Sequence, residues 1–300
     1  MNIERDAQVM KIMITGGKGQ LGMDCVRVFR KAHEVVSVDL DEADITQLSE
    51  VERLVQTFAP DIILNCAAYT HVDNCETEKE LAWSANVKGS ENIAFSLNKR
   101  DGLMIHISTD YVFNGGKKIP EPYVETDHSH PISYYGVTKY ESEQMVKRTI
   151  GQYIIVRTAW MYGISGSNFL KTILKLALKH PGKQIKVVND QFGSPTWSHR
   201  LALQIAKIIE ANERGVFHAT SEGYCTWYEL ATYFLQKMDV THSVIPCTTV
   251  QYPTPARRPK NSILENRYLK AKGINIMPDW KDDVDQFVAN FRDRLLSETT

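Results

Sequence analysis

The stretch Val9–Gly22, with the sequence VMKIMITGGKGQLG, decides the fold. It joins an apolar strand-like run, Val9–Thr15, to a segment with the pattern of a helix, Gln20–Lys31. The turn between them carries glycines in a GxxGxxG pattern, at Gly16, Gly19 and Gly22. Glycine is needed because the turn is tight, because the backbone must approach a pyrophosphate, and because the helix must pack closely on the strand. Free N–H groups at the helix N-terminus attract phosphate, so the stretch predicts a dinucleotide site; a purely structural turn is the alternative.

The rest of the first half alternates short apolar segments with helical ones. Strands are expected at Glu34–Asp39, Asp61–Asn65, Leu103–Ser108 and Tyr153–Thr158, and helices at Leu48–Phe58, Glu78–Lys99 and Tyr134–Thr149. Apolar strands without alternation are typical of a sheet covered on both faces, and alternating strands and helices imply parallel βαβ units. We therefore predict an α/β fold with a Rossmann-type doubly wound parallel sheet, in which residues 10–158 form the NAD(P)-binding domain.

The second half is less regular. Helices are expected at Asn168–Lys179, His199–Ala211 and Trp227–Met238, and the proline-rich segment Pro246–Asn261 is expected to be a loop. We predict that residues 159–300 form mainly a smaller, mixed α/β substrate-binding lobe, packed against the first domain, and that some of its strands return to the sheet.

Composition excludes several classes of protein. The 300 residues are 43% hydrophobic and 24% charged, as in globular proteins, and the net charge of -1 is unlike the basic excess of nucleic-acid-binding proteins. No apolar run reaches the ~20 residues that span a bilayer, so no membrane partner is expected. Met1–Val9 is mixed and polar, so we expect a frayed extension and not a secretory signal. Scattered cysteines without a CxxC pair predict free thiols in the cytoplasm, and the histidines show no ligand spacing, so no protein metal site is expected.

Acidic and small residues follow the next two strands. Asp39 ends the second expected strand, where a carboxylate can accept hydrogen bonds from the adenosine ribose and favour NAD over NADP; a turn residue is the alternative. Asp44 lies just beyond, within reach of the adenine amino group. The third strand ends at Asn65-Cys66-Ala67-Ala68, whose small side chains allow the backbone to pass under a cofactor or simply to pack tightly.

A tyrosine and a lysine four residues apart on a helix project from the same face. A nearby ammonium stabilises a phenolate, so we expect it to lower the tyrosine pKa and produce a general acid at neutral pH. The spacing occurs three times in the chain: Tyr135/Lys139, Tyr233/Lys237 and Tyr268/Lys272. Only the first pair lies in the βαβ region, after a strand that ends in Ser108-Thr109-Asp110, and ligands bind at the carboxyl ends of such strands. We therefore expect Tyr135 and Lys139 to be catalytic, with Thr109 bonding the carbonyl oxygen that Tyr135 protonates.

These residues together resemble the extended short-chain dehydrogenase/reductases. Four further strings make the chain similar to the dTDP-4-dehydrorhamnose reductase family: Ser108–Phe113 (STDYVF), Arg157–Tyr162 (RTAWMY), Val188–Thr196 (VNDQFGSPT) and Tyr252–Pro259 (YPTPARRP). The resemblance runs from about Met10 to the last helix. The sequence departs from the family at Cys66, where alanine is usual, and at Asn114, where aspartate is common.

The resemblance implies reduction of the C4 ketone of dTDP-4-dehydro-L-rhamnose to dTDP-L-rhamnose by NADPH or NADH, the last step of dTDP-rhamnose synthesis. It implies that Tyr135 is the proton donor and that Lys139 holds the nicotinamide ribose. It also implies that Thr109 influences how readily Tyr135 gives up its proton. The sugar site would contain Thr109, Asp110 and Trp160. The cofactor site would contain Gly19, Gln20, Leu21, Asp39, Asp44, Ile45, Ala68, Tyr69 and Thr70. Some members bind Mg²⁺ at a dimer contact; those ligands cannot be placed in this sequence, so Mg²⁺ and a homodimer stay open.

A dTDP-sugar carries a diphosphate, and a chain with a net charge near zero must supply local cations for it. The loop Tyr252–Asn261 offers Arg257 and Arg258, stiffened by prolines, and arginine binds phosphate oxygens in a bidentate manner. We expect Arg258 to contact the diphosphate; an ordinary solvated loop is the alternative.

Two other functions are weighed against the reductase. A related nucleotide-sugar dehydratase or epimerase is the first, but a dehydratase needs an acid and a base beside the catalytic threonine, and Asp110 is followed by Tyr111. A non-enzymatic regulatory subunit resembling that of methionine adenosyltransferase is the second. The intact Thr109, Tyr135 and Lys139 set favours the enzyme.

Overall fold

The computed structural model describes residues 9–180, 182–241 and 243–298, so the N-terminal extension expected at Met1–Val9 lies almost wholly outside the described residues. Its centre is a six-stranded sheet with the order β10-β5-β4-β3-β1-β2. The strands are β1 (Lys11–Thr15), β2 (Glu34–Val38), β3 (Ile62–Asn65), β4 (Leu103–Thr109), β5 (Tyr153–Thr158) and β10 (Gly215–His218). Every pairing in it is parallel, as expected for a doubly wound sheet.

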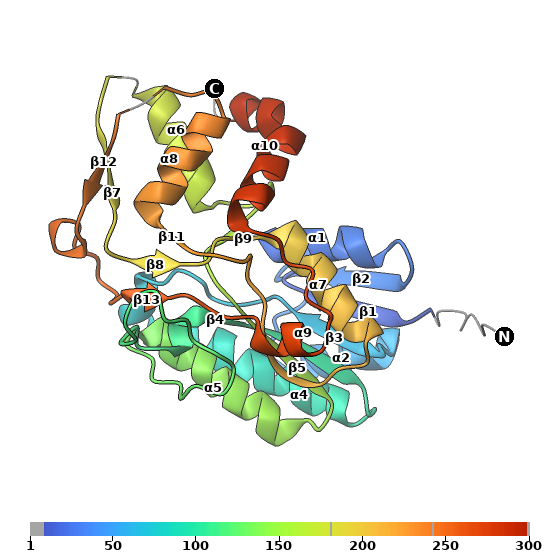
Figure 1. Cartoon of the computed structure of the whole chain (residues 1–300). Coiled ribbons are helices and arrows are strands. Elements are labelled where there is room, and N and C mark those ends of the chain that lie inside the picture. The colour runs from blue at the N-terminus through green and yellow to red at the C-terminus, as the bar shows by residue number, and fades with distance from the viewer. Residues whose placement is uncertain (1–8, 181, 242, 299–300) are drawn as a thin grey trace.

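Helices cover both faces of this sheet, which explains why its strands are apolar without alternation. One face packs on α1 (Gln20–Phe29) and α7 (Ser198–Glu210). The other packs on α2 (Leu48–Phe58), α4 (Gly89–Asn98) and α5 (Tyr134–Thr149). Figure 1 shows the two helical layers on opposite sides of the strands. The sheet is therefore the middle layer of a three-layer sandwich.

The order in which successive strands are added to the sheet reverses between β1 and β3. From β1 the chain passes to β2 at one edge, and from β2 it returns to β3 on the other side of β1. In open α/β sheets, ligands bind at such a switch point, outside the carboxyl ends of the strands. The glycine turn after β1 and the small residues after β3 thus meet at this point.

The long helix expected at Glu78–Lys99 is interrupted. It consists of α3 (Lys79–Trp83), a π-helical turn (η2, Ser84–Lys88) and α4. The π turn contains the buried Asn86, whose side chain bonds the backbone of Tyr69. Single π turns within helices often occur at functional sites, and this turn supports a segment that follows β3.

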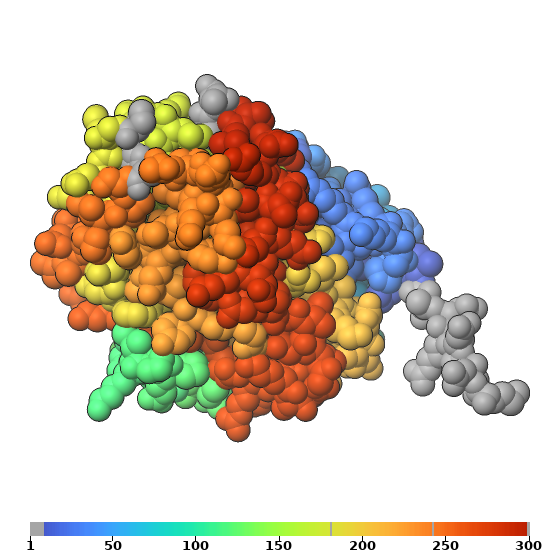
Figure 2. Space-filling model, turned by 45° about the horizontal axis from the view of Figure 1, so that its top comes forward, coloured from blue at the N-terminus to red at the C-terminus, as the bar shows by residue number. Residues whose placement is uncertain are grey.

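The second half builds a separate core from α6 (Phe169–Lys179), α8 (Trp227–Lys237) and α10 (Trp280–Ser297). Its short strands form small sheets that pair β12 (Val244–Cys247) with β7 (Ile185–Val188), β6 (Met161–Tyr162) with β9 (Thr196–Trp197), and β11 (Cys225–Thr226) and β13 (Asn261–Ser262) with β8 (Phe192–Gly193). In Figure 2 the yellow, orange and red second half covers most of the visible face and adjoins the blue start of the chain. The shorter elements are η1 (Asn74–Glu76), η3 (Asp110–Val112), η4 (Thr249–Gln251) and α9 (Arg267–Ala271).

Both bounds of the expected loop Pro246–Asn261 were predicted wrongly, and its last residue, Asn261, lies in β13. The loop was expected to begin at Pro246, but Pro246 lies within β12, paired with Val187 of β7. A proline lacks the N–H that a central strand must donate, but it is accepted in an edge strand. A two-stranded sheet consists only of edges, so the proline did not end the strand.

Candidate active site

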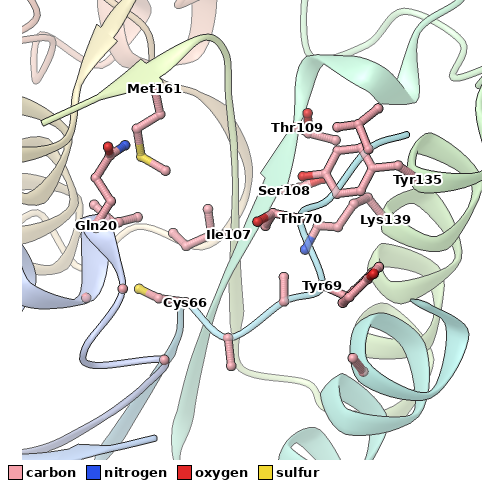
Figure 3. A pocket seen from close by; sticks show the side chains of 18 of the residues that line it. Gln20, Cys66, Tyr69, Thr70, Ile107, Ser108, Thr109, Tyr135, Lys139 and Met161 are labelled. Carbon is pink, nitrogen blue, oxygen red and sulfur yellow. The ribbon is translucent and has the colours of Figure 1, made fainter. Parts of the chain in front are cut away.

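A cavity of about 1140 Å³ opens at the carboxyl ends of β1, β3, β4 and β5. Residues from both halves of the chain line it, among them the glycine turn and aromatic side chains of the second half. Figure 3 shows side chains that point into this space, among them Gln20, Cys66, Tyr135 and Lys139. The cavity brings together every cofactor residue that the sequence predicted: Gly16, Gly19, Gln20, Leu21, Gly22, Asp39, Asp44, Ile45, Ala68, Tyr69, Thr70, Tyr135 and Lys139.

Two glycines of the turn, Gly16 and Gly22, have no room for a side chain. Gly16 has a φ of 67°, and a Cβ there would lie 2.6 Å from the backbone nitrogen of Ala67. A Cβ on Gly22 would lie 2.1 Å from the carbonyl oxygen of Gly16. Helix α1 begins at Gln20 with Gly19 as its N-cap, and no side chain caps its first backbone N–H groups. This cradle fits a dinucleotide diphosphate, because helix N-termini attract phosphate.

An acidic corner follows β2. The Asp39 carboxylate accepts hydrogen bonds from the backbone N–H groups of Lys18 and Leu40, each at 2.9 Å. The Lys18 amine forms ion pairs with Asp41 and Glu42. The charge of Lys18 is therefore shared with two carboxylates of this corner, and it offsets Asp39 only in part.

A buried polar chain ties the strand ends to α5. Thr15 donates to Asn65 Oδ1 at 2.8 Å, and the Asn65 amide lies 3.3 Å from Nδ1 of His106. Nε2 of His106 lies 2.9 Å from Ser142 Oγ, whose hydroxyl donates to the carbonyl of Lys139 at 2.7 Å. Burial, assisted by the charge of Lys139, holds the pKa of His106 well below its usual value. A neutral histidine can thus bridge β3 and the helix that carries Lys139.

Helix α5 places the predicted catalytic pair. Ser133 caps it by accepting the N–H of Gly136 at 3.2 Å. A Cβ on Gly136 would lie 2.3 Å from the carbonyl oxygen of Tyr111, so glycine lets the helix start directly against the segment that follows β4. Both Tyr135 and Lys139, one turn apart, then point into the cavity (Figure 3).

The pKa of Tyr135 was expected to be lowered, and it is raised instead. Burial raises the pKa of Tyr135 above its ordinary value, and the carboxylate of Asp110 raises it further, whereas a hydrogen bond to Thr109 opposes the rise only in part. Burial also lowers the pKa of Lys139 to about 8, although the Glu143 carboxylate acts against this change. Tyr135 is therefore held in its protonated form, as a proton donor must be before reaction.

Thr109 and Asp110 form a unit at the end of β4. The Thr109 hydroxyl donates to Asp110 Oδ1 at 2.9 Å and accepts the N–H of Tyr111 at 3.2 Å. Asp110 is 2% exposed, and among the residues that the structure describes its Oδ2 has no hydrogen-bond partner. Burial raises the pKa of Asp110 to about 6. In this arrangement the Thr109 proton is directed to Asp110, so Asp110 fixes the orientation of the hydroxyl.

Of the four residues predicted for the sugar, Thr109, Asp110 and Trp160 line the cavity. Arg258 is not among the described residues that line it; its guanidinium binds Asp73 through Nη1 at 3.0 Å and Nη2 at 2.9 Å. The ion pair fastens the proline-rich loop to η1.

The other two Tyr–Lys pairs lie elsewhere. Tyr233 and Lys237 both donate to Asp285, at 2.8 and 2.7 Å. Lys272 forms an ion pair with Glu213 at 2.7 Å, beyond the end of α9, which contains Tyr268. Position in the sheet therefore separated the candidate pairs where spacing could not.

Sequence reasoning missed several polar residues of the site. Asn86 and His106 are buried, and Glu143 forms a buried bidentate ion pair with Arg157, at 2.8 and 2.7 Å. A histidine inside the apolar run of β4 was the one local signal for such a network. No group of three or more His, Cys, Asp or Glu side chains in residues 9–180, 182–241 and 243–298 could hold a metal ion. No helix of the same residues is long and apolar enough to cross a membrane.

Known proteins resemble the chain along nearly its whole length. The family described as RmlD substrate binding domain matches residues 10–293. A dTDP-4-dehydrorhamnose reductase from Burkholderia thailandensis is 36% identical over 289 residues, which cover 91% of this chain and 96% of the relative. The reductase of the same name from Escherichia coli (strain K12) is 34% identical over 289 residues, 91% of this chain and 95% of the relative. A crystal structure of a Bacillus anthracis dTDP-4-dehydrorhamnose reductase in complex with NADP has a TM-score of 0.91 and 37% identity, covering 94% of this chain and all of that one.

Proposed function

Because the chain belongs to the RmlD substrate binding family, we infer that it reduces the C4 ketone of dTDP-4-dehydro-L-rhamnose to dTDP-L-rhamnose, with NADPH or NADH as reductant. One observation carries the inference. Residues of the glycine turn Gly16–Gly22, Tyr135 and Lys139 line a single cavity. The family match covers all of these residues. Oxidoreductase chemistry on a nucleotide sugar needs this combination of a cofactor cradle and a proton donor.

The residues of the chain divide the work as follows. The turn Gly16–Gly22 and the N-terminus of α1 would hold the diphosphate of the cofactor, and Lys139 would hold its nicotinamide ribose. The reduced nicotinamide, when bound, supplies a hydride for C4. Tyr135 gives its Oη proton to the oxygen that was the ketone, and its raised pKa keeps that proton in place until then.

Lys139 stabilises the phenolate that remains on Tyr135. At neutral pH the ammonium is present, because its lowered pKa of about 8 still lies above neutrality. Thr109 would lie beside the ketone oxygen that Tyr135 protonates, and its hydroxyl is oriented by Asp110. Release of the alcohol is followed by reprotonation of Tyr135 from solvent.

The sugar nucleotide would meet the far end of the cavity. Asp110 and Trp160 would contact the sugar, and Arg258 would contact the diphosphate after exchanging or sharing its partner Asp73. All five cysteines are free, which supports a reducing, cytoplasmic setting. A homodimer belongs to the same proposal; the described residues offer no cluster for the Mg²⁺ that some relatives use.

The decisive experiment is oxidation of NADPH or NADH by the purified protein, followed by absorbance. Turnover is expected with dTDP-4-dehydro-L-rhamnose and not with dTDP-glucose or UDP-glucose. Turnover of dTDP-glucose to a 4-keto-6-deoxy sugar would instead indicate a dehydratase. Absence of any turnover, together with co-purification of a methionine adenosyltransferase, would indicate the regulatory subunit.

A further inference from the structure

Three aromatic side chains form a ladder along one wall of the cavity. The indole of Trp160 stacks on that of Trp227 with ring centroids 3.6 Å apart and planes 7° apart. Phe169 lies against Trp227 at 4.6 Å and 58°. All three line the cavity, but they come from separate elements: Trp160 follows β5, Trp227 begins α8, and Phe169 begins α6. The ladder thus joins the sheet to the second lobe at the site.

Trp160 depends on its neighbours for its position. Its φ of 46° lies in the left-handed region, which residues other than glycine rarely adopt without support from the surrounding structure. A Cβ on Gly193 would lie 2.4 Å from the ring of Trp160, so the backbone of β8 also presses on the indole. The indole is confined by Gly193 and Trp227 together.

Trp227 is itself held firmly. Thr226 caps α8 through a capping box with Glu229, so the first turn of the helix is fixed. Strand β11 pairs Cys225 with Gly193 and thereby sets Trp227 beside the glycine that Trp160 touches. Trp227 can therefore serve as a rigid support for Trp160.

The place of the ladder indicates which ligand it serves. Thr109 and Thr158 are paired in the sheet, so Trp160, two residues after Thr158, extends from the strand next to Asp110. The glycine turn follows β1, which β3 and β4 separate from β5 in the sheet. An apolar wall beside Asp110 suits the hexose of a nucleotide sugar better than the cofactor diphosphate.

We propose that Trp227 is a positioning residue for the sugar: it holds Trp160 in the orientation that sugar binding requires. This inference rests on the proposed function, since it concerns the sugar end of the same site. It predicts that Trp227 contributes to substrate affinity only while Trp160 is present.

The test compares Trp227→Ala, Trp227→Phe, Trp160→Ala and the double alanine variant. Trp227→Ala should raise the KM for dTDP-4-dehydro-L-rhamnose by about tenfold, the effect of losing one stacked aromatic pair, and change kcat and the Kd for NADPH by less than about threefold. Trp227→Phe should restore KM to within about threefold of the wild type. In the Trp160→Ala background, Trp227→Ala should change KM less than about twofold, because the two residues act as one unit.

The control is Phe291→Ala on α10, which removes an aromatic ring packed against the core of the same lobe, away from the cavity. It should lower Tm and leave KM unchanged. An unchanged KM in Trp227→Ala, or equal effects of that change with and without Trp160, overturns the inference. Failure of the wild type to turn over the substrate would instead overturn the proposed function, so the two outcomes are distinct.

Discussion

At the scale of single residues, Tyr135 has a phenol whose pKa is raised and whose helix begins against the end of β4. Tyr135→Phe should reduce kcat by on the order of 10²–10⁴, the usual contribution of one general acid. The Kd for NADPH should be preserved, because the ring and Lys139 remain. Steady-state turnover and cofactor titration measure the two effects.

Tyr233 and Tyr268 provide the controls for that change. Tyr233 donates to Asp285 on the surface of the second lobe, and Tyr268 lies on α9. Phenylalanine at either position should leave kcat within a few-fold of the wild type. A large loss at one of them, or near-normal turnover in Tyr135→Phe, would move the proton donor away from Tyr135.

The lowered pKa of Lys139 predicts that activity falls at alkaline pH. Its folded pKa of about 8 lies below the ordinary lysine value, so the ammonium is complete at lower pH and is lost as pH rises through 8. The kcat/KM should therefore decline above about pH 8. Glu143, one turn further along α5, acts to keep Lys139 charged; although burial opposes its ionisation, Arg157 and Ser108 hold the pKa of Glu143 below its usual value.

Removing the Glu143 charge should move this limit. Glu143→Gln should shift the alkaline limb of the kcat/KM profile to lower pH, because the amide no longer stabilises the Lys139 cation. Glu141→Gln, on the same helix, should leave the limb in place. A merely structural role for Glu143 would lower Tm without displacing the limb, and that result would contradict the prediction.

Position along the chain was enough for the sequence to single out two residues that lie in the cavity. Tyr135 and Lys139 were singled out because they follow a strand end, and the structure places both in the cavity. The direction of the Tyr135 pKa could not be predicted, since it depends on burial and on Asp110, both set by tertiary packing. Glu143 and His106 were missed for the same reason: each has partners on another element.

At the scale of elements, the loop Tyr252–Asn261 is fastened to η1 by the pair Arg258–Asp73. Arg258→Ala should raise the KM for the dTDP-sugar by about tenfold or more, through loss of a charged hydrogen bond, and leave the Kd for NADH nearly unchanged. Arg257→Ala is the matched control, because Arg257 is exposed on the same loop. A fall in cofactor affinity with unchanged substrate KM would assign the loop to the cofactor instead.

The turn after β2 predicts the choice of cofactor. Asp39 repels a 2′-phosphate, and Lys18 is paired with Asp41 and Glu42, so NADH should serve at least as well as NADPH. Asp39→Asn should raise the kcat/KM for NADPH relative to NADH, because the amide keeps an acceptor oxygen without the charge. A wild-type preference for NADPH above about tenfold, worth ~1.4 kcal/mol, would contradict the role given to Asp39.

Local sequence patterns predicted most helices and strands of the first half but not all element boundaries. The strands and helices of the first half appear where apolar periodicity placed them, because local pattern and burial agree there. The π turn at Ser84–Lys88 and the strand through Pro246 do not follow from local pattern. The π turn contains Asn86, which bonds the backbone of Tyr69, and the strand pairs with β7, so both involve contacts with distant parts of the chain.

At the scale of the whole molecule, residues of both halves build the core around the central sheet. Strand β10 pairs with β5 in the central sheet, and α7 packs on α1. Ser198 at the start of α7 donates to the buried Asp24 of α1 at 2.6 Å. The halves are therefore not independent units of stability.

A fragment of residues 10–158 should accordingly lack a cooperative thermal transition. It would leave β5 as an open sheet edge and uncover the face of α1 that α7 protects. Differential scanning calorimetry of the fragment beside the full chain measures this. A sharp transition in the fragment, with native-like NADH binding, would show that the first half folds alone.

The return of the chain to the central sheet also bears on how such proteins can be recombined. A chimera that joins the first 158 residues of one relative to the remainder of another would divide the sheet between two parents at β5 and β10. The second half leaves the central sheet in two stretches, residues 159–197 and 219–298, on either side of α7 and β10, although α9 of the second stretch packs against the core of the sheet. Crossovers placed at those joints would transplant the sugar-binding surface and leave one parent's sheet intact, so specificity could be exchanged without mixing the framework that binds the dinucleotide.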